Sequence, residues 1–456
     1  MSRTSPDRLA NPAAPEAPVS AAGPDARVTV VGLDAAGAPP HPALAPALAA
    51  AGLVVGAARH LAAVPVPPGA DTVVLGPLAP AVGRLSAAVA AGVPAVVLAS
   101  GDPGLFGIVR RLRAAGLPLR VVPAVSSVAA AFARAGLPWD GAAVVTAHGR
   151  DPRPALNACR ALPLVAVLTA PGAGATELGA GLIGWSRRLL VAEHLGTDAE
   201  RVRAVTPEQA ATETWSDPHV LLSLADTDTD TDAVPADPAP AAAAPADSAF
   251  AAAASGRVAP GGMRSDNQPA AAPAGGWALP EGRYAHRDSM ITKSEVRALV
   301  VARLRPRLGR LIWDVGAGSG SVGIECALLG AAVLAVEQDA ASAATIRANA
   351  TAHAVTVRVV VGRAPAALAG LPEPDAVFVG GGGVDVLPAV MARRPERVVL
   401  TLAALDRVAP AVGLLRAAGY AVEGSQLSAA RLADLPGGSI RLAATNPVVV
   451  LTGERQ

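Results

Sequence analysis

The sequence predicts an α/β protein built from two successive segments, and three observations support that fold class. Short apolar runs with the length of β-strands alternate with alanine-rich runs with the length of helices in both halves of the chain. Glycine-rich turns follow several of the apolar runs, as they do where a strand passes into a helix beside a ligand. Between the halves, residues 225–276 consist largely of Ala, Pro and Asp. The 456 residues are therefore expected to form two domains joined by a linker.

The N-terminal half, residues 27–224, is expected to contain six strands with helices between them, one of which is Ser126–Ala135. The preceding residues 1–26 are rich in Pro, Ala and Ser and lack the apolar core of a signal peptide, so a disordered leader is predicted. The six strands are predicted at Arg27–Leu33, Ala95–Ala99, Leu119–Val122, Ala143–Thr146, Leu164–Leu168 and Leu189–Ala192.

The C-terminal half, residues 277–456, is expected to form a seven-stranded Rossmann-like sheet. Only a short connection is expected between the last two strands, which predicts that they pair antiparallel. The strands are predicted at Leu311–Val315, Ala332–Val336, Val357–Val361, Asp375–Val379, Arg397–Thr401, Ala421–Gln426 and Pro447–Leu451. Residues 225–276 hold seven aspartates, two arginines and few large apolar side chains, so this segment is predicted to be a disordered linker.

The overall composition argues against several classes of protein. The 38 basic and 37 acidic residues nearly cancel, which argues against a protein that binds nucleic acid through phosphate contacts. No run of about 20 strongly apolar residues is present, so no membrane span is expected. The two cysteines and seven histidines lack metal-ligand spacing, so no metal site is predicted. A cytoplasmic protein is expected.

In the C-terminal half, a predicted strand runs directly into a glycine-rich turn. Glycines there let the backbone turn tightly and approach a ligand closely. The next strand ends at Glu337, 21 residues after the first glycine, where a carboxylate can accept both ribose hydroxyls of a nucleoside. An adenosine-type cofactor is therefore expected to bind at Gly316, Ala317, Gly318, Ser319, Gly320 and Glu337.

Two classes of enzyme use such a turn. An NAD-dependent dehydrogenase stays open as an alternative because Gly318, Gly320 and Gly323 fit the dinucleotide fingerprint. Asp314 favours a methyltransferase, since a carboxylate at the strand end suits the cationic amino acid end of S-adenosylmethionine. The later glycine run Gly380–Gly383 marks the place where a substrate would enter.

Five motifs of this half resemble, in order, the methyltransferase domain of the precorrin methylases of cobalamin (vitamin B12) biosynthesis. The resemblance implies a precorrin, a tetrapyrrole with many carboxylates, as substrate, and contacts of S-adenosylmethionine with Thr292, the Gly316–Gly320 turn, Glu337 and Ala364. The motifs are ITKSEVRAL (291–299), WDVGAGSGSVGIE (313–325), VEQDAASAATIRANA (336–350), VGRAPAAL (361–368) and PDAVFVGGG (374–382).

Lys293 is the only lysine of the chain, beside 37 arginines. A compact ammonium and a planar guanidinium are not interchangeable, which singles this residue out. Its neighbours Thr292 and Glu295 fit a helix capping box, which leaves the lysine itself unexplained. Together with Arg297, Lys293 is expected to bind a substrate carboxylate, and it is the candidate catalytic residue.

The N-terminal half carries a second set of motifs, which include VVGL (30–33), LASGDPGLFGI (98–108) and a PAVSSV segment (123–128). Taken singly, Asp102 with Pro103 is a turn, and Ser126 or Ser127 is a helix cap. Taken together, the motifs resemble the tetrapyrrole methylase family, which implies a domain of two subdomains with S-adenosylmethionine in a cleft between them. The resemblance places the cofactor against Asp102, Leu105, Ser127 and Val128 and the macrocycle against Arg59, His60, His148 and Arg150.

The order of the two resemblances is that of the fused, decarboxylating precorrin methyltransferases. It implies methylation of carbons 5 and 15 with loss of carbon dioxide from the ring C acetate, carried out by a homo-oligomer. Asp34 stands where the tetrapyrrole methylases have a second glycine, so the alternative of an N-terminal half that only binds the tetrapyrrole stays open. A small-molecule methyltransferase outside corrin synthesis is a further alternative.

Overall fold

The computed structural model describes residues 28–34, 41–226, 277–287 and 291–456, and the predicted leader and nearly all of the predicted linker lie outside these ranges. The chain divides into two compact units, one ending at Ala130 and one beginning at Ala131. The first unit is a five-stranded, fully parallel sheet with the order β3–β2–β4–β1–β5. Its elements are β1 (Val28–Leu33), α1 (Leu44–Ala49), β2 (Leu53–Gly56), α2 (Ala58–Ala63), β3 (Asp71–Val74), α3 (Leu78–Ala90), β4 (Ala95–Ser100), α4 (Val109–Ala114) and β5 (Leu119–Val122).

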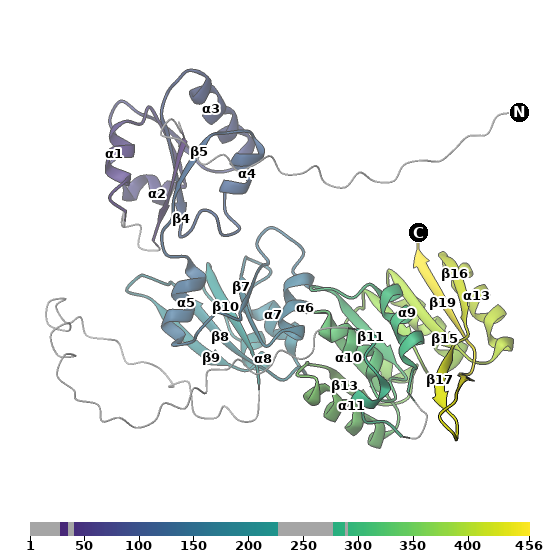
Figure 1. Ribbon diagram of the computed structural model, residues 1–456. Helices are drawn as coiled ribbons and strands as arrows, with labels where there is room; N and C mark the ends of the chain where they lie inside the picture. Colours follow the sequence, from purple (N-terminus) through teal and green to yellow (C-terminus); the bar gives the residue numbers. More distant parts are fainter. Residues whose placement is uncertain (1–27, 35–40, 227–276, 288–290) are drawn as a thin grey trace, which may run out of the picture. The chain divides into compact units, whose positions relative to one another are not determined.

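Helices cover both faces of this first sheet (Figure 1). One face packs against α3 and α4 through Leu85 and Leu112, and the other packs against α1 through Leu44 and Leu48. Helix α5 (Ser127–Ala135) follows and contains the division between the two units.

The second unit begins with a mixed five-stranded sheet of order β6–β7–β10–β8–β9, in which only β6 and β7 pair in parallel. Its elements are β6 (Ala143–Thr146), α6 (Arg153–Ala161), β7 (Leu164–Leu168), α7 (Ala175–Leu182), β8 (Arg187–Glu193), β9 (Arg201–Val205), α8 (Pro207–Thr212) and β10 (His219–Ala225).

A seven-stranded sheet follows, with the order β13–β12–β11–β14–β15–β19–β16. The five strands β13, β12, β11, β14 and β15 pair in parallel with their neighbours. Strand β19 runs antiparallel to both of its neighbours, β15 and β16. The strands are β11 (Leu311–Val315), β12 (Ala332–Glu337), β13 (Arg358–Val361), β14 (Ala376–Val379), β15 (Arg397–Leu402), β16 (Tyr420–Leu427) and β19 (Val448–Arg455). The helices are η1 (Glu281–Arg283), α9 (Ser294–Leu304), α10 (Ser321–Leu328), α11 (Ala340–Ala352), η2 (Ala366–Leu368), η3 (Gly383–Val386), α12 (Leu387–Ala392), η4 (Leu405–Arg407) and α13 (Val408–Ala417).

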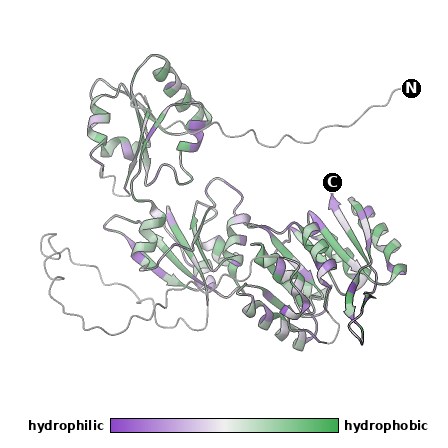
Figure 2. Cartoon of the chain, in the orientation of Figure 1, coloured by the Kyte–Doolittle hydropathy of each residue, from purple (hydrophilic) through white to green (hydrophobic). Residues whose placement is uncertain are grey.

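The central strand β11 shows why this sheet forms. All five of its residues are buried, as expected for a parallel strand with helices on both faces. Trp313 and Val315 belong to the core on one face, whereas Ile312 belongs to the core on the other, so alternate side chains serve the two faces. Hydrophobic residues accordingly dominate the strands in Figure 2.

The predicted α/β class and the seven-stranded sheet with its antiparallel last pair are confirmed. The expected short connection before the final strand is wrong, because a separate two-stranded ribbon lies there, made of β17 (Ala430–Asp434) and β18 (Ile440–Ala444). Four strands of the two smaller sheets were also not predicted: β2, β3, β9 and β10.

Candidate active site

The glycine-rich turn after β11 needs glycine for conformation and for space. Gly316, Gly318 and Gly320 have φ angles of 70°, 58° and 74°, which L side chains rarely adopt. A Cβ atom on Gly316 would lie 2.6 Å from the backbone of Gly381, the glycine run after β14. A Cβ atom on Gly318 would meet nothing within 4 Å. The turn is thus packed tightly against Gly381 at Gly316 and is open at Gly318.

The end of β12 brings Glu337 to this turn. Its Oε2 accepts a hydrogen bond from the N–H of Gly318 at 2.8 Å, and its Oε1 accepts one from the N–H of Asp339 at 3.0 Å. Because β11 and β12 are paired in parallel, their carboxyl ends meet at the same edge of the sheet. The neighbouring N–H of Gly362 donates to the Glu337 carbonyl oxygen at 2.9 Å, which puts the segment that contains Ala364 beside Glu337. The structure therefore places Gly318, Glu337 and the segment that contains Ala364 next to one another.

Asp314 lies in β11 just before the turn and has no exposed surface. Its Oδ2 accepts a hydrogen bond from the N–H of Gly323 at 2.9 Å, and its Oδ1 is buried with no hydrogen-bond partner among the described residues. Burial raises the pKa of this carboxyl to about 7, and the negative charge of Glu337 acts in the same direction. A carboxylate is thus held at the base of the turn with one free acceptor.

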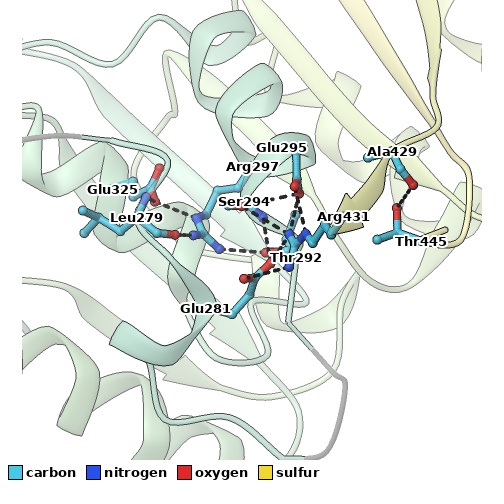
Figure 3. A network of polar contacts seen from close by, with 10 residues as sticks. All are labelled: Leu279, Glu281, Thr292, Ser294, Glu295, Arg297, Glu325, Ala429, Arg431 and Thr445. Atoms are coloured by element: carbon cyan, nitrogen blue, oxygen red, sulfur yellow. Dashed lines mark hydrogen bonds and ion pairs between the residues drawn. The ribbon is translucent and has the colours of Figure 1, made fainter. Parts of the chain in front are cut away.

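Thr292 and Lys293 end the segment that precedes α9, and Arg297 fixes the backbone of this segment. The Arg297 guanidinium donates to the Thr292 carbonyl oxygen at 2.7 Å and to Glu325 Oε1 at 2.6 Å. Both ion-pair partners are completely buried. The expectation that Arg297 binds substrate is therefore wrong, because Glu325 already neutralises its charge inside the protein (Figure 3).

The predicted capping box at the start of α9 is also wrong. The residue before the helix is Lys293 rather than Thr292, and no side chain caps the helix. Glu295 instead forms an ion pair with Arg431, which reaches it from the ribbon strand β17 and also pairs with Glu281 (Figure 3). Hydrogen bonding from Arg431 lowers the pKa of Glu281 to about 2, so this cluster stays ionised at neutral pH. Among the described residues, the Lys293 side chain has no hydrogen-bond or ion-pair partner.

A cavity of about 430 Å³ lies at the ends of β14 and β15. Its wall includes the whole glycine run predicted for substrate entry, together with the residues that follow β15. Sequence reasoning did not single out Arg407, which also lines this cavity. The lining residues are Val379, Gly380, Gly381, Gly382, Gly383, Leu400, Thr401, Leu402, Ala403, Ala404, Arg407 and Val448.

In the N-terminal unit, the ends of β1 and β4 are in close contact. A Cβ atom on Gly32 would lie 2.0 Å from the Gly101 carbonyl oxygen, so only glycine fits there. Beyond Gly101, Asp102 closes a tight turn: its Oδ1 accepts from the N–H of Gly104 at 2.8 Å, and its carbonyl oxygen accepts from the N–H of Leu105 at 3.1 Å. The predicted turn is present, and the side chain of Asp102 is engaged in it.

The other predicted residues of this unit fall into two groups. Ser126 caps α5 by accepting from the N–H of Ala129 at 3.1 Å, so Ser127 and the buried Val128 lie in the first turn of that helix. Arg59 and His60 of α2 both contact the hydroxyl of Ser100, at 2.9 and 3.0 Å. Burial, assisted by Arg59, lowers the pKa of His60, which keeps this imidazole neutral. His148 and Arg150 belong to the second unit, after β6.

Two family models match this chain in succession. The model of the "Tetrapyrrole (Corrin/Porphyrin) Methylases" matches residues 42–211, and that of the "Precorrin methyltransferase domain" matches residues 283–450. A probable cobalt-precorrin-6B C(15)-methyltransferase (decarboxylating) of Pyrobaculum calidifontis is 38% identical over 36% of this chain and 87% of its own length. The chain belongs to the precorrin methyltransferase family.

Two relatives with longer alignments carry the name precorrin-6Y C(5,15)-methyltransferase [decarboxylating]. The one from Sinorhizobium is 38% identical over 306 residues, which are 64% of this chain and 63% of the relative. The one from Mycobacterium tuberculosis is 32% identical over 67% of each chain. The match thus spans just under two thirds of the Sinorhizobium relative.

Two kinds of feature are absent from the described part of the chain. Within it, no three His, Cys, Asp or Glu side chains gather in a way that suits a metal ion. No helix of the described ranges is long and apolar enough to cross a membrane. The cytoplasmic location and the lack of a nucleic-acid partner stay predictions.

Proposed function

We propose that this chain uses S-adenosylmethionine to methylate a precorrin at carbons 5 and 15 and removes carbon dioxide from the ring C acetate. One observation carries the proposal. The 306-residue alignment with a precorrin-6Y C(5,15)-methyltransferase is far longer than either family match, so it includes parts of both halves. The N-terminal half, residues 27–224, then methylates carbon 5. The C-terminal half, residues 277–456, methylates carbon 15 and decarboxylates.

The residues around the C-terminal glycine turn fit S-adenosylmethionine. The backbone beside Gly318 is open, so a ligand can approach it, and Glu337 lies against that backbone as an acceptor for ribose hydroxyls. The free Oδ1 of Asp314 is an acceptor for the cationic end of the cofactor. Thr292 and Ala364 complete the proposed cofactor contacts. In the N-terminal half, Asp102, Leu105, Ser127 and Val128 have the corresponding role.

Methyl transfer depends mainly on orientation. When bound, S-adenosylmethionine supplies a methyl group on a positively charged sulfur. The chain's own residues hold the two reactants: the glycine turn and Glu337 fix one, and the cavity beside Gly381 receives the other. Lys293, held at the start of α9 by the Arg297 contact with Thr292, orients a substrate carboxylate with its ammonium group.

The stoichiometry of cofactor binding tests this proposal. Calorimetric titration of the full chain with S-adenosylmethionine is expected to show two sites. Glu337→Ala removes the ribose acceptor and is expected to leave one binding site. The control Glu423→Ala changes an exposed glutamate of β16 and is expected to leave both binding sites. A variant Glu337→Ala that still binds two equivalents would contradict the proposed C-terminal site.

A second candidate function for the N-terminal half is binding of the tetrapyrrole without catalysis. It is favoured by Asp34, whose Oδ1 is buried without a hydrogen-bond partner in the described ranges. A side chain at this position would crowd the cofactor, which would hinder methyl transfer without preventing the tetrapyrrole from binding elsewhere in this half. If Asp34→Gly raises carbon-5 methylation from a negligible rate, this second function describes the natural chain.

We also propose a homo-oligomer that assembles through the ribbon of β17 and β18. Leu432, Ile440 and Leu442 are between 61% and 71% exposed on this ribbon, an unusual density of large apolar side chains in water. An isolated two-stranded ribbon is marginally stable, and within the described chain neither strand pairs with any further strand. A second copy of the same ribbon presents the same apolar side chains, as a twofold interface requires.

A further inference from the structure

The cavity at the ends of β14 and β15 directly adjoins the glycine turn. A Cβ atom on Gly381 would lie 3.2 Å from Gly316 Cα, so the two glycine backbones touch. One belongs to the proposed cofactor turn, and the other lines the cavity. Parallel strands place ligands beyond their carboxyl ends, and both glycines are at that edge of the sheet. A group bound in this cavity is therefore next to a group bound at the turn.

The cavity contains one charged side chain. Among its lining residues, all but Thr401 and Arg407 are apolar or glycine, so Arg407 is the one charged group in this wall. Leu402 is buried and Leu405, which precedes Arg407 by two residues, is 69% exposed at the same edge. An apolar wall with one cation suits a flat apolar molecule that carries a carboxylate.

Within the described residues, the Arg407 guanidinium is not engaged in an ion pair, as several other arginines of this domain are. Arg303, Arg310, Arg393 and Arg397 each form an ion pair with a glutamate. In the described part of the chain, Arg407 forms none, although it is exposed and able to do so. Its charge is available to a ligand.

The glycine run lies directly against this guanidinium. A Cβ atom on Gly383 would lie 2.8 Å from Arg407 Nη1, so glycine at this position leaves room for the arginine against the loop. Gly383 also has a φ angle of 63°, which favours glycine independently. The Arg407 guanidinium and the loop that contains Gly383 therefore lie side by side in the cavity wall.

We propose that Arg407 binds a side-chain carboxylate of the tetrapyrrole and holds the macrocycle in this cavity, beside the cofactor turn. The assignment rests on the proposed function and names the group that recognises its substrate. A guanidinium can form two parallel hydrogen bonds with a carboxylate, which fixes orientation as well as charge. Lysine keeps the charge but not this geometry.

Steady-state kinetics of the full chain test the assignment. The variants are Arg407→Ala, Arg407→Lys and, as matched control, Arg416→Ala, which removes an exposed arginine of α13 outside this cavity. For Arg407→Ala we expect the KM for the precorrin to rise at least tenfold, with the affinity for S-adenosylmethionine and the melting temperature unchanged. Arg407→Lys is expected to fall between Arg407→Ala and the wild type, and Arg416→Ala to match the wild type.

The outcomes distinguish a wrong assignment of Arg407 from a wrong proposed function. If the wild type turns over the precorrin and Arg407→Ala has the KM of Arg416→Ala, the assignment is wrong and the proposed function stands. If the wild type binds S-adenosylmethionine but leaves the precorrin unchanged, the proposed function is wrong and the assignment is wrong with it.

Discussion

Asp314 combines a cost in stability with a proposed role in binding. Its carboxyl is fully buried, its Oδ1 lacks a partner in the described chain, and its pKa is about 7 instead of 3.8. The unfolded chain releases this proton near pH 4, whereas the folded chain holds it up to about pH 7. The folded state thus binds more protons between these values, and its stability falls as the pH rises through them. By pH 8 the loss is roughly 4 kcal/mol.

We predict that Asp314→Asn stabilises the protein at pH 8 and weakens binding of S-adenosylmethionine. The amide keeps the acceptor for the N–H of Gly323 but cannot ionise, so the gain should be large at pH 8 and small at pH 5. Calorimetric melting of the full chain at both pH values measures it. The exposed Asp406→Asn serves as control. An equal loss of stability at both pH values would contradict the assigned pKa.

Lys293 is predicted to act on the substrate rather than on the fold. Lys293→Ala is expected to lower the rate of decarboxylation at least tenfold, because an ammonium that orients a carboxylate is lost. The melting temperature should not change, since no polar partner of this side chain is present in the described residues. Release of carbon dioxide from the precorrin is the readout. Unchanged decarboxylation and substrate binding would show that the lysine has no role in the site.

The sequence predicted site residues best where the chemistry is local. Asp314, the glycine turn and Glu337 follow a spacing that strand and helix lengths determine, so their meeting could be foreseen. The position of Arg407 could not be foreseen. Its contact with Gly383 joins the segment after β14 to the segment after β15, and these segments meet only because the two strands pair. The burial of Arg297 was equally hidden, since a charged residue enters a core only when a partner such as Glu325 enters with it.

Among the secondary-structure elements, the buried strands were the easiest to predict. β11, β12 and β15 are mostly apolar and wholly or almost wholly buried, and such runs indicate strands that are covered on both faces. β3 is largely exposed and starts with an aspartate, so it lacks that pattern. The ribbon β17–β18 was hidden for a different reason: within this chain its apolar side chains face solvent rather than a core.

The ribbon is predicted to hold copies of the chain together. Changing both Leu432 and Leu442 to Ser should shift the mass measured by light scattering from an oligomer to a monomer, because the apolar contact is lost. Leu435→Ser, which changes a less exposed leucine in the turn, is the control. A monomeric wild type, or an oligomer that survives the double change, would contradict an interface at the ribbon.

At the scale of the whole molecule, matches to two methyltransferase families of different build follow each other on one chain. The first unit and the mixed sheet carry the match to the tetrapyrrole methylases, and the seven-stranded sheet carries the match to the precorrin methyltransferase domain. The predicted boundaries at residues 224 and 277 stay predictions. Under the proposed function, one chain would carry out both methylations without a second enzyme.

Mass spectrometry of the product tests this central claim most directly. The purified full chain is incubated with S-adenosylmethionine and the reduced precorrin-6 substrate. We predict a product that has gained two methyl groups and lost one carbon dioxide. A product with one methyl group and the same loss of carbon dioxide would mean that the N-terminal half does not catalyse methylation. Asp34 would then be the first residue to test as the cause. A substrate recovered unchanged would contradict the proposed function.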